Sequence, residues 1–281
     1  MILVTGSTGT TGGEVAKQLI AAGHKPRLLV RSPEKAKQFE GKAELVKGDL
    51  SDAASLTAAF KGIEKLYLVS AGLDGPAQEA KAIDAAKAAG VKHVVKLSVI
   101  GAEYEMISFG KWHRASEKKL EASGLAWTFV RPGNFMSNAM MWAGSIKKDG
   151  AVSAPVGEGK TANIDPVDIG AVAVKALTSS GHEGKAYTIT GPVALTMQEQ
   201  LDIIGKRIGK SLKFIDVPPE AAKKSMLEMH MPEGYVNALI ELYAVMKANQ
   251  ASMVTNVVEE VTGRKAATFE SWVDRHAGIF G

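Results

Sequence analysis

The sequence predicts an α/β protein in which a doubly wound parallel sheet is followed by a smaller, mostly helical C-terminal lobe. Two observations lead to this fold class. Over the first half of the chain, short apolar runs alternate with amphipathic stretches, which is typical of βαβ units in series. The runs are apolar throughout, as expected of strands that helices cover on both faces. After about residue 150 this regularity fades.

Six segments are candidate strands, because each is short and rich in β-branched or other apolar residues. In order they are 2–5 (ILVT), 26–31 (PRLLVR), 43–49 (AELVKGD), 65–70 (KLYLVS), 93–99 (HVVKLSV) and 127–132 (WTFVRP). Amphipathic stretches between them, such as EVAKQLIAAG and AQEAKAIDAAKAAG, are expected to form the intervening helices. Six βα units in series predict one parallel sheet.

The rest of the chain predicts a smaller lobe over 151–281, with some segments returning to the sheet of the first domain, 1–150. Thr196 and Glu199 in TMQEQLDII form a capping-box pattern, so we expect a helix to begin there. Prolines separate three further helical stretches. They lie at about 219–229, 234–248 and 268–277.

The composition argues against several classes of function. The chain has no cysteine, which excludes disulfides, thiolate catalysis and cysteine-ligated metals and agrees with a cytoplasmic location. Its net charge of +4 is spread without a run of five like charges, so we expect no nucleic-acid partner. We also expect no membrane span, no export signal and no metal, because no long apolar window and no metal-ligand spacing of histidines occurs. Monomer and homodimer both stay open.

A glycine-rich turn follows the first expected strand. In TGSTGTTGGEVAKQL, Gly6, Gly9 and Gly12 have GxxGxxG spacing, and a helix is expected directly after them. Backbone N–H groups at such a turn point at a pyrophosphate together with the positive end of the helix dipole, and side chains there would keep the phosphate away. Plain turns also use glycine, but strand, turn and helix stand here in the required order. We interpret the first domain as a dinucleotide-binding domain of Rossmann type.

The end of the second strand indicates which dinucleotide binds. Enzymes that use NAD usually have an Asp or Glu there, which accepts from the ribose 2′-OH. Here Arg31 occupies that position, and Lys35 is expected one turn into the next helix. Two cations can reach a 2′-phosphate and no carboxylate repels it, which favours NADPH as the cofactor. The alternative is that Arg31 is a solvated cation at a strand end.

The chain resembles the NmrA-like proteins of the atypical short-chain dehydrogenase/reductase superfamily, among them bacterial NADPH quinone oxidoreductases and triphenylmethane-dye reductases. Seven segments carry the resemblance, and together they span most of residues 1–191. They are TGSTGTTG (5–12), LLVRSPEKA (28–36), KGDLSD (47–52), AAKAAGVKHVV (85–95), HRASEK (113–118), LEASGLAWTFVRPGNF (120–135) and HEGKAYTITG (182–191).

The resemblance implies a set of cofactor-binding residues, nearly all at the carboxyl ends of strands, where open α/β sheets bind ligands. For the pyrophosphate they are Gly6, Ser7, Thr8, Gly9, Thr10 and Thr11, and for the 2′-phosphate Arg31 with Lys35. For the adenine they are Asp49 and Leu50, for the ribose and its linkage to nicotinamide Ser70, Ala71 and Gly72, and for the nicotinamide Pro132, Gly133, Asn134 and Phe135, with Ser98 nearby.

The catalytic pair of the wider superfamily is absent. Members of that superfamily use a tyrosine and, four residues later, a lysine on the helix after the fifth strand. In this sequence His113 and Glu117 stand at those two positions, and Val99 stands near the place of the expected serine. Tyr243 and Lys247 do have the Tyr-x-x-x-Lys spacing, but they lie in the C-terminal lobe, and we interpret the match as chance.

Three interpretations of His113 and Glu117 stay open. They form an acid/base pair, in which the carboxylate orients a histidine that titrates near neutral pH. Alternatively, they contact the ribose or carboxamide of the cofactor. The third interpretation is an i,i+4 contact that only stabilises the helix, by about 0.3–0.5 kcal/mol.

The segment NFMSNAMMWAG (134–144) is a candidate wall for the substrate, although methionine and aromatic side chains are more often core. Its candidate substrate residues are Phe135, Met136, Met140 and Trp142. We therefore predict an NADPH-dependent reductase that transfers hydride to a small aromatic or quinone-like electrophile. The alternatives are a non-catalytic NADP-binding redox sensor and, disfavoured by the missing Tyr and Lys, a sugar-nucleotide epimerase-like enzyme.

Overall fold

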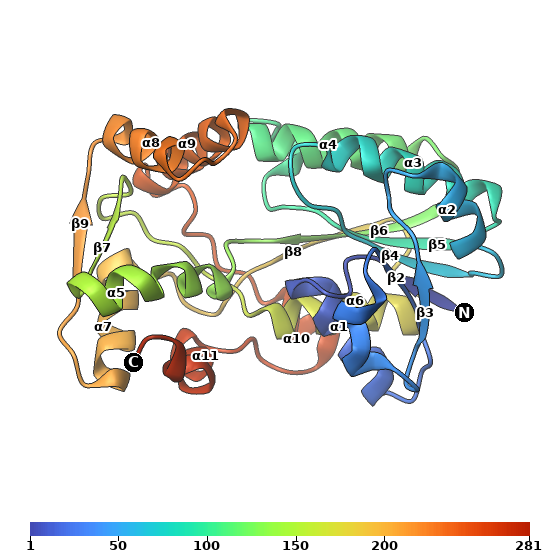
Figure 1. Cartoon of the computed structure of the whole chain (residues 1–281), viewed down its shortest axis with the longest axis horizontal. Coiled ribbons are helices and arrows are strands. Elements are labelled where there is room, and N and C mark those ends of the chain that lie inside the picture. The colour runs from blue at the N-terminus through green and yellow to red at the C-terminus, as the bar shows by residue number, and fades with distance from the viewer. The chain divides into compact units, whose positions relative to one another are not determined.

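The computed structural model describes all residues, 1–281, and has an α/β architecture (Figure 1). Seven strands form the main sheet. They are β1 (Ile2–Val4), β2 (Arg27–Val30), β3 (Glu44–Lys47), β4 (Lys65–Leu68), β5 (His93–Leu97), β6 (Ala126–Pro132) and β8 (Lys185–Ile189). Their order in the sheet is β3-β2-β1-β4-β5-β6-β8, with parallel pairing from β3 through β6. The order reverses at β1 and β4, which is the switch point where doubly wound sheets bind ligands.

Helices cover both faces of this sheet. They are α1 (Thr10–Ala21), α2 (Ala53–Ala59), α3 (Gly75–Ala88), α4 (Ser108–Glu121) and α6 (Pro166–Thr178), together with the 3₁₀ helices η1 (Pro33–Phe39) and η2 (Ala102–Tyr104). Helices α2, α3 and α4 lie on one face, and α1 and α6 lie side by side on the other (Figure 1). A buried apolar cluster that includes Leu3, Leu66, Val94 and Phe129 joins the sheet to its helices.

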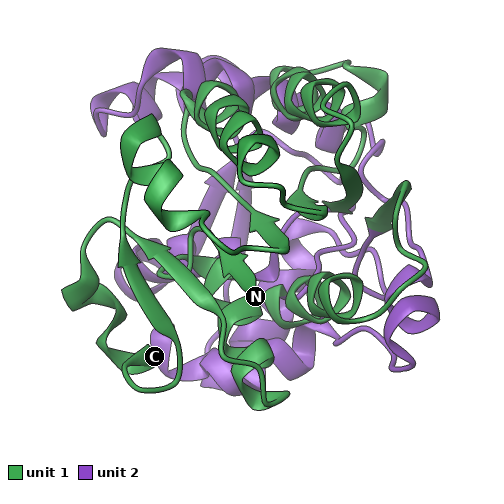
Figure 2. Ribbon diagram, turned by 90° about the vertical axis from the view of Figure 1, so that its right-hand side faces the viewer, with its two compact units in different colours: residues 1–132, 166–188 green, residues 133–165, 189–281 purple.

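The chain divides into two compact units, coloured separately in Figure 2. Unit 1 comprises residues 1–132 and 166–188, and unit 2 comprises residues 133–165 and 189–281. The sequence pattern suggested a division near residue 150. The units divide at 132/133 instead, because the chain leaves the sheet at the end of β6, re-enters unit 1 with α6 and rejoins the sheet at β8.

Unit 2 has its own helices and a small sheet. Its elements are η3 (Met136–Trp142), α5 (Ala143–Asp149), β7 (Ala151–Ala154), α7 (Met197–Ile208), β9 (Lys213–Asp216), α8 (Pro219–Glu228), α9 (Glu233–Lys247), α10 (Val257–Thr262), α11 (Phe269–His276) and η4 (Ala277–Ile279). Strands β7 and β9 pair in parallel. The core of unit 2 contains Leu201 and Ile204 of α7 together with Phe269 and Trp272 of α11.

Most of the expected elements are confirmed. All six candidate strands are present, with ends that differ by at most two residues, and α8, α9 and α11 lie at the three helical stretches. Both bonds of the capping box form at the start of α7: Glu199 N–H donates to Thr196 Oγ1 (3.1 Å) and Thr196 N–H to Glu199 Oε2 (2.7 Å). The segment after β2, which carries Lys35, is a 3₁₀ helix. None of the helices is long and apolar enough to cross a membrane.

Candidate functional site

The glycine-rich turn between β1 and α1 has two glycines that the fold itself requires. Gly6 has a φ of +61°, in the left-handed region, and a Cβ there would approach Val69 Cγ1 to 2.7 Å. A Cβ on Gly12 would lie 2.3 Å from Gly6 O, inside van der Waals contact. At Gly9 a Cβ would meet only Gly6 O, at 3.3 Å, and this residue is exposed. Apart from this one close approach, no atom of the protein lies within 4 Å of the place that a Cβ of Gly9 would take.

The N-terminus of α1 is free to bind an anion. Its N-cap, Gly9, has no side chain to accept from the first-turn N–H groups, and no acidic residue lies in that turn. These N–H groups have no partner within a helix and carry the positive end of its dipole. The hydroxyl of Ser7 is buried and has no hydrogen-bond partner within the chain. Thr8 and Thr10, on either side of Gly9, are exposed. The turn thus fits a pyrophosphate.

Arg31 directly follows β2, is exposed, and forms no hydrogen bond or ion pair within the chain. Lys35, on η1, is also exposed. Asp49 follows β3, and its carboxylate accepts from Ser51 N–H at 2.7 Å and from Ser51 Oγ at 2.6 Å. These bonds lower the pKa of Asp49, and the charge of Arg31 contributes to the shift. Arg31 and Lys35 are therefore both available to a 2′-phosphate, and the carboxylate of Asp49 is already bonded to Ser51.

A line of polar side chains runs from the end of β4 to α4. Ser70 Oγ donates to Glu79 Oε1 at 3.0 Å, and the ammonium of Lys96 lies 3.1 Å from Glu79 Oε2. The same ammonium donates to Leu97 O at 2.8 Å and lies 3.1 Å from Nδ1 of His113. Lys96 and Glu79 are buried, with 0% and 2% of their surfaces exposed. The three N–H bonds of the ammonium therefore each have an acceptor.

This arrangement fixes the protonation state of His113. Burial, and secondly the positive charge of Lys96, lowers the pKa of His113 to about 3. The imidazole is therefore neutral at physiological pH. Because Nδ1 accepts from the Lys96 ammonium, the ring proton is on Nε2. His113 can donate one hydrogen bond, and it does not act as an acid that titrates near neutral pH.

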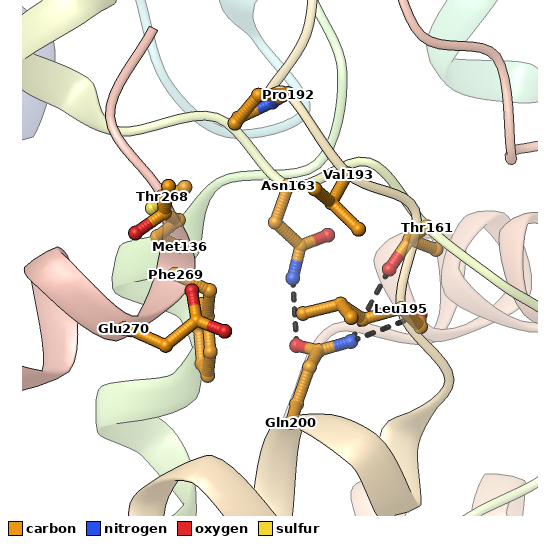
Figure 3. Close-up of a pocket in the computed structure, with 10 residues that line it drawn as sticks. All are labelled: Met136, Thr161, Asn163, Pro192, Val193, Leu195, Gln200, Thr268, Phe269 and Glu270. Atoms are coloured by element: carbon orange, nitrogen blue, oxygen red, sulfur yellow. Dashed lines mark hydrogen bonds between the residues drawn. The ribbon is translucent and has the colours of Figure 1, made fainter.

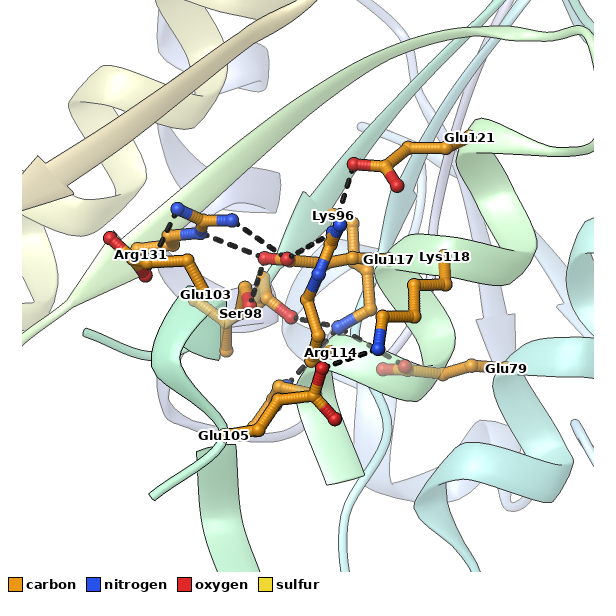
Figure 4. A network of polar contacts seen from close by, with 12 residues as sticks. Glu79, Lys96, Ser98, Glu103, Glu105, Arg114, Glu117, Lys118, Glu121 and Arg131 are labelled. Carbon is orange, nitrogen blue, oxygen red and sulfur yellow. Dashed lines mark hydrogen bonds and ion pairs between the residues drawn. The ribbon is translucent and has the colours of Figure 1, made fainter. Parts of the chain in front are cut away.

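Glu117 lies in a different network, which Figure 4 shows. Its carboxylate accepts from Arg131 Nε (2.9 Å) and Arg131 Nη2 (2.8 Å). It also accepts from Ser98 Oγ at 2.6 Å and from Arg114 Nη1 at 3.1 Å. Glu103 pairs with the remaining Nη1 of Arg131 at 3.0 Å. Glu117 is completely buried, so its carboxylate is fully occupied inside the protein.

The structure thus separates the two candidate catalytic residues. His113 faces Lys96, Glu117 faces Arg131, and neither bonds to the other. The expected orientation of the histidine by the carboxylate does not occur, because Arg131 and Ser98 occupy both carboxylate oxygens. Sequence reasoning missed Lys96 and its partner. Lys96 could have been found from its place in HVVKLSV, a mostly apolar run that was expected to be a buried strand. A charge buried there needs a partner.

Unit 2 contains a cavity of about 380 Å³. Apart from Tyr243, its walls carry no ionisable side chain, and five methionines line it. The methionines are Met141, Met197, Met226, Met229 and Met246, and the polar lining residues include Asn134, Asn138, Ser153, Thr161, Gln200, Ser225 and Tyr243. Methionine adapts its shape to different apolar ligands. Size and composition suit a flat, largely apolar molecule.

The structure divides the predicted substrate residues. Trp142 lines the cavity. Met136 is 1% exposed and belongs to the core of unit 2, and Met140 packs against the same core. Phe135, the N-cap of η3, is half-buried and is not part of the cavity lining. Helices α8 and α9 supply much of the remaining wall, which sequence reasoning did not foresee.

Tyr243 and Lys247 do not reproduce the superfamily's catalytic pair. They lie one turn apart on α9, but the ammonium of Lys247 is bonded to Asp216 at 2.8 Å. Burial raises the pKa of Tyr243, so the phenol stays protonated. Tyr243 nevertheless lines the cavity of unit 2.

Four amide side chains form a continuous hydrogen-bonded chain in unit 2. Asn138 Nδ2 donates to Asn134 Oδ1 (2.7 Å), and Asn134 Nδ2 donates to Asn163 Oδ1 (3.0 Å). Asn163 Nδ2 donates to Gln200 Oε1 at 2.7 Å, and Gln200 Nε2 reaches Thr161 Oγ1 at 3.4 Å. Figure 3 shows the buried end of the chain, beside a cavity of only about 10 Å³.

Known proteins resemble the whole chain. The family model described as "NmrA-like family" matches residues 1–274. An NAD(P)H azoreductase from Xenophilus azovorans is 40% identical over 284 residues, covering 100% of this chain and 99% of that protein. The structure of an Escherichia coli NADPH-dependent quinone oxidoreductase with NADPH superposes with a TM-score of 0.89, at 27% identity and coverage of 98% and 99%. A Citrobacter triphenylmethane reductase with NADP(H) gives 0.84, at 26% identity and coverage of 96% and 98%.

Proposed function

The chain belongs to the NmrA-like family, and on that premise we propose that it is an NADPH-dependent reductase of small aromatic or quinone-like electrophiles. The expected resemblance, fold class and cofactor agree with relatives whose names include an NAD(P)H azoreductase and an NADPH-dependent quinone oxidoreductase. The observation that carries the proposal is the turn at 5–12, where the exposed Gly9 leaves the N-terminus of α1 without a side-chain cap.

Unit 1 provides residues for the two phosphate groups. The N–H groups at the start of α1, with Ser7, Thr8 and Thr10, would hold the pyrophosphate. Arg31 would hold the 2′-phosphate, with Lys35 as a second cation, because both side chains are exposed and Arg31 has no partner in the chain. Asp49, Leu50, Ala71 and Gly72 remain proposed contacts for the adenosine and ribose. The side chain of Ser70 is committed to Glu79.

When bound, NADPH supplies a hydride, which carries two electrons and one hydrogen, and leaves as NADP⁺. The acceptor then takes up one proton, so that a quinone becomes a hydroquinone. A quinone or dye is already electrophilic, and water can supply the proton. The main tasks of the residues are therefore to bind and orient the cofactor and the substrate and to exclude water. A strong acid is not needed.

We assign His113 the role of a neutral hydrogen-bond donor to the cofactor. Its proton is held on Nε2 because Lys96 occupies Nδ1, and its low pKa keeps the ring uncharged. Glu117 is assigned to holding Arg131 and Ser98 inside unit 1. Of the three interpretations of this pair, cofactor contact fits His113 and a structural role fits Glu117.

The nature of the cavity in unit 2 supports an aromatic substrate. It is large enough for a two-ring molecule, its wall contains Trp142, and the methionines supply polarizable contacts to aromatic rings. The azo and quinone groups in the names of two relatives are flat and conjugated, and the triphenylmethane group in a third name is aromatic.

NADPH oxidation against a panel of quinones, azo dyes, triphenylmethane dyes and enals tests the proposal. We expect turnover above the rate without protein for at least one class, with NADPH preferred over NADH. Titration with NADPH and NADP⁺ runs in parallel. Tight binding of both without turnover of any acceptor would contradict the reductase and favour an NADP-binding sensor.

A further inference from the structure

The cavity of unit 2 has one polar feature that its apolar walls do not explain. Most members of the hydrogen-bonded chain line the cavity, namely Asn134, Asn138, Gln200 and Thr161, and the remaining one, Asn163, is 6% exposed. Asn138 is the end of the chain that only donates, whereas every other amide in it both accepts and donates. The bond to Asn134 fixes the orientation of the Asn138 amide at the cavity wall.

The far end of the amide chain is held firmly. Asn163 lies in an extended segment whose neighbour Ile164 bonds through its N–H to Asn134 O at 2.8 Å. A Cβ on Gly191 would lie only 1.9 Å from Asn163 O, so the two backbones touch. Gln200 lies in the first turn of α7, directly after the capping box of Thr196. Asn163 and Gln200 therefore act as fixed anchors for Asn134 and Asn138.

The terminal amide has unused hydrogen-bonding groups. Asn138 Nδ2 uses one of its two N–H groups on Asn134, and no partner within the chain takes the second N–H or Oδ1. The polar groups of this residue are thus available at the wall of a cavity whose other contacts are mostly apolar. A ligand with one hydrogen-bond acceptor would satisfy the free N–H.

We propose that Asn138 donates its free N–H to the acceptor oxygen of the substrate, the carbonyl oxygen of a quinone or conjugated ketone. This inference rests on the proposed function and names the group that recognises the substrate. When a quinone accepts a hydride, it becomes a hydroquinone monoanion with the negative charge on oxygen, and a proton from water completes the hydroquinone. A preorganised neutral donor at that oxygen stabilises the charge as it develops.

The kinetic test uses Asn138→Ala, with Asn237→Ala as the matched control. Asn237 is an exposed asparagine on α9 that does not line the cavity. With 1,4-naphthoquinone, Asn138→Ala should lower kcat by about 100-fold, the lower end of the range for loss of a donor to a developing oxyanion, and leave the Kd for NADPH within twofold. Asn237→Ala should change kcat less than about threefold, as expected of a group outside the transition-state contact. Equal effects of the two variants on kcat would overturn the proposal.

Asn138→Asp supplies a readout that a packing role would not give. The new carboxyl matches the amide in shape, donates when protonated, and repels the developing charge when ionised. We expect kcat of this variant to be low at pH 8 and to recover toward the wild-type value as the pH falls to about 5, near the titration range of a half-buried carboxyl. A pH profile parallel to that of the wild type would contradict a contact between Asn138 and the reacting oxygen.

A binding test separates this inference from the proposed function. The probes are 2-acetonaphthone and 2-ethylnaphthalene, which differ in the carbonyl oxygen, and the signal is tryptophan fluorescence, to which Trp142 in the cavity wall contributes. The wild type should prefer the ketone, and Asn138→Ala should lose about 5–10-fold of that preference, the value of one hydrogen bond. This binding result is expected even if the protein turns over no acceptor. Absence of turnover would refute the proposed reductase function but not the contact made by Asn138. Unchanged ketone preference in Asn138→Ala would refute the role of Asn138.

Discussion

Replacing Glu117 by glutamine tests whether this residue is structural. The carboxylate is completely buried and accepts four hydrogen bonds, two of them from Arg131. The amide has the same shape but leaves the buried guanidinium without its main counter-charge. Breaking a buried ion pair costs about 3–5 kcal/mol, and Glu103 still faces Arg131, so we expect about 3 kcal/mol. A change of 1 kcal/mol shifts the thermal midpoint of a large domain by about 2–4 °C, which gives a fall of about 6–12 °C.

Differential scanning fluorimetry without cofactor measures this shift, and Glu103→Gln is the control. Glu103 makes one bond to the same guanidinium, at 3.0 Å, but its side chain is 35% exposed. Its variant should lower the midpoint by less than about 3 °C, as expected of a partly solvated pair. A Glu117→Gln variant with wild-type midpoint and a hundredfold lower kcat would refute the structural assignment and restore the catalytic one.

The pH dependence of the midpoint gives a second check on Glu117. Burial alone would raise the pKa of Glu117, but hydrogen bonds from Arg131 and Ser98 and the nearby guanidinium charges hold it below the ordinary value of 4.5. The folded protein therefore binds this proton less readily than the unfolded chain. The stabilisation is complete above pH 4.5 and is lost as the pH falls below that value. The difference in midpoint between wild type and Glu117→Gln should shrink under acid.

Three further predictions concern unit 1. Arg31→Ala should weaken NADPH by about 10–100-fold and leave NADH nearly unchanged in calorimetric titrations, since it removes one charge-assisted contact; equal losses for both would refute the assignment. Gly9→Val should abolish NADPH binding with only a modest fall in the thermal midpoint. Gly12→Val should unfold the protein, because its Cβ would lie 2.3 Å from Gly6 O, and a folded Gly12 variant would contradict this geometry. His113→Ala should weaken NADPH binding by less than about tenfold. The wild-type rate should show no histidine inflection near pH 6.5, because the pKa of His113 is about 3. An inflection that disappears in the variant would show instead that His113 titrates in catalysis.

The main sheet could be predicted from the sequence because its strands are buried on both faces. Runs such as HVVKLSV are then mostly apolar, and their ends agree with the structure within two residues. Strand β8 was not predicted, since Lys185 and Ala186 are exposed at the edge of the sheet and interrupt the pattern. Strands β7 and β9 were not predicted either, because polar or exposed residues such as Ser153, Lys213 and Asp216 interrupt them and leave no apolar run.

The candidate site was predictable only where its chemistry is local. The turn around Gly9 directly follows the first expected strand, and Arg31 lies at the end of the second. Their order in the sequence was therefore enough to locate them. The partners of His113 and Glu117 come from other strands, β5 and β6, and no spacing in the sequence specifies which charge meets which. The cavity wall likewise depends on how α8 and α9 pack.

The polypeptide passes between the two units at 132/133, at 165/166 and again at 188/189. Neither unit is therefore encoded by one uninterrupted stretch of gene. A single crossover with a relative at 132/133 would carry the cavity of unit 2 into the hybrid, but it would also replace α6, which packs on α1 in the parent. A chimaera that exchanges only the substrate cavity has to transplant 133–165 and 189–281 together and retain 166–188. Recombination between close relatives is consequently a poor route to new substrates in this fold, and point substitution within the cavity wall is the more accessible one.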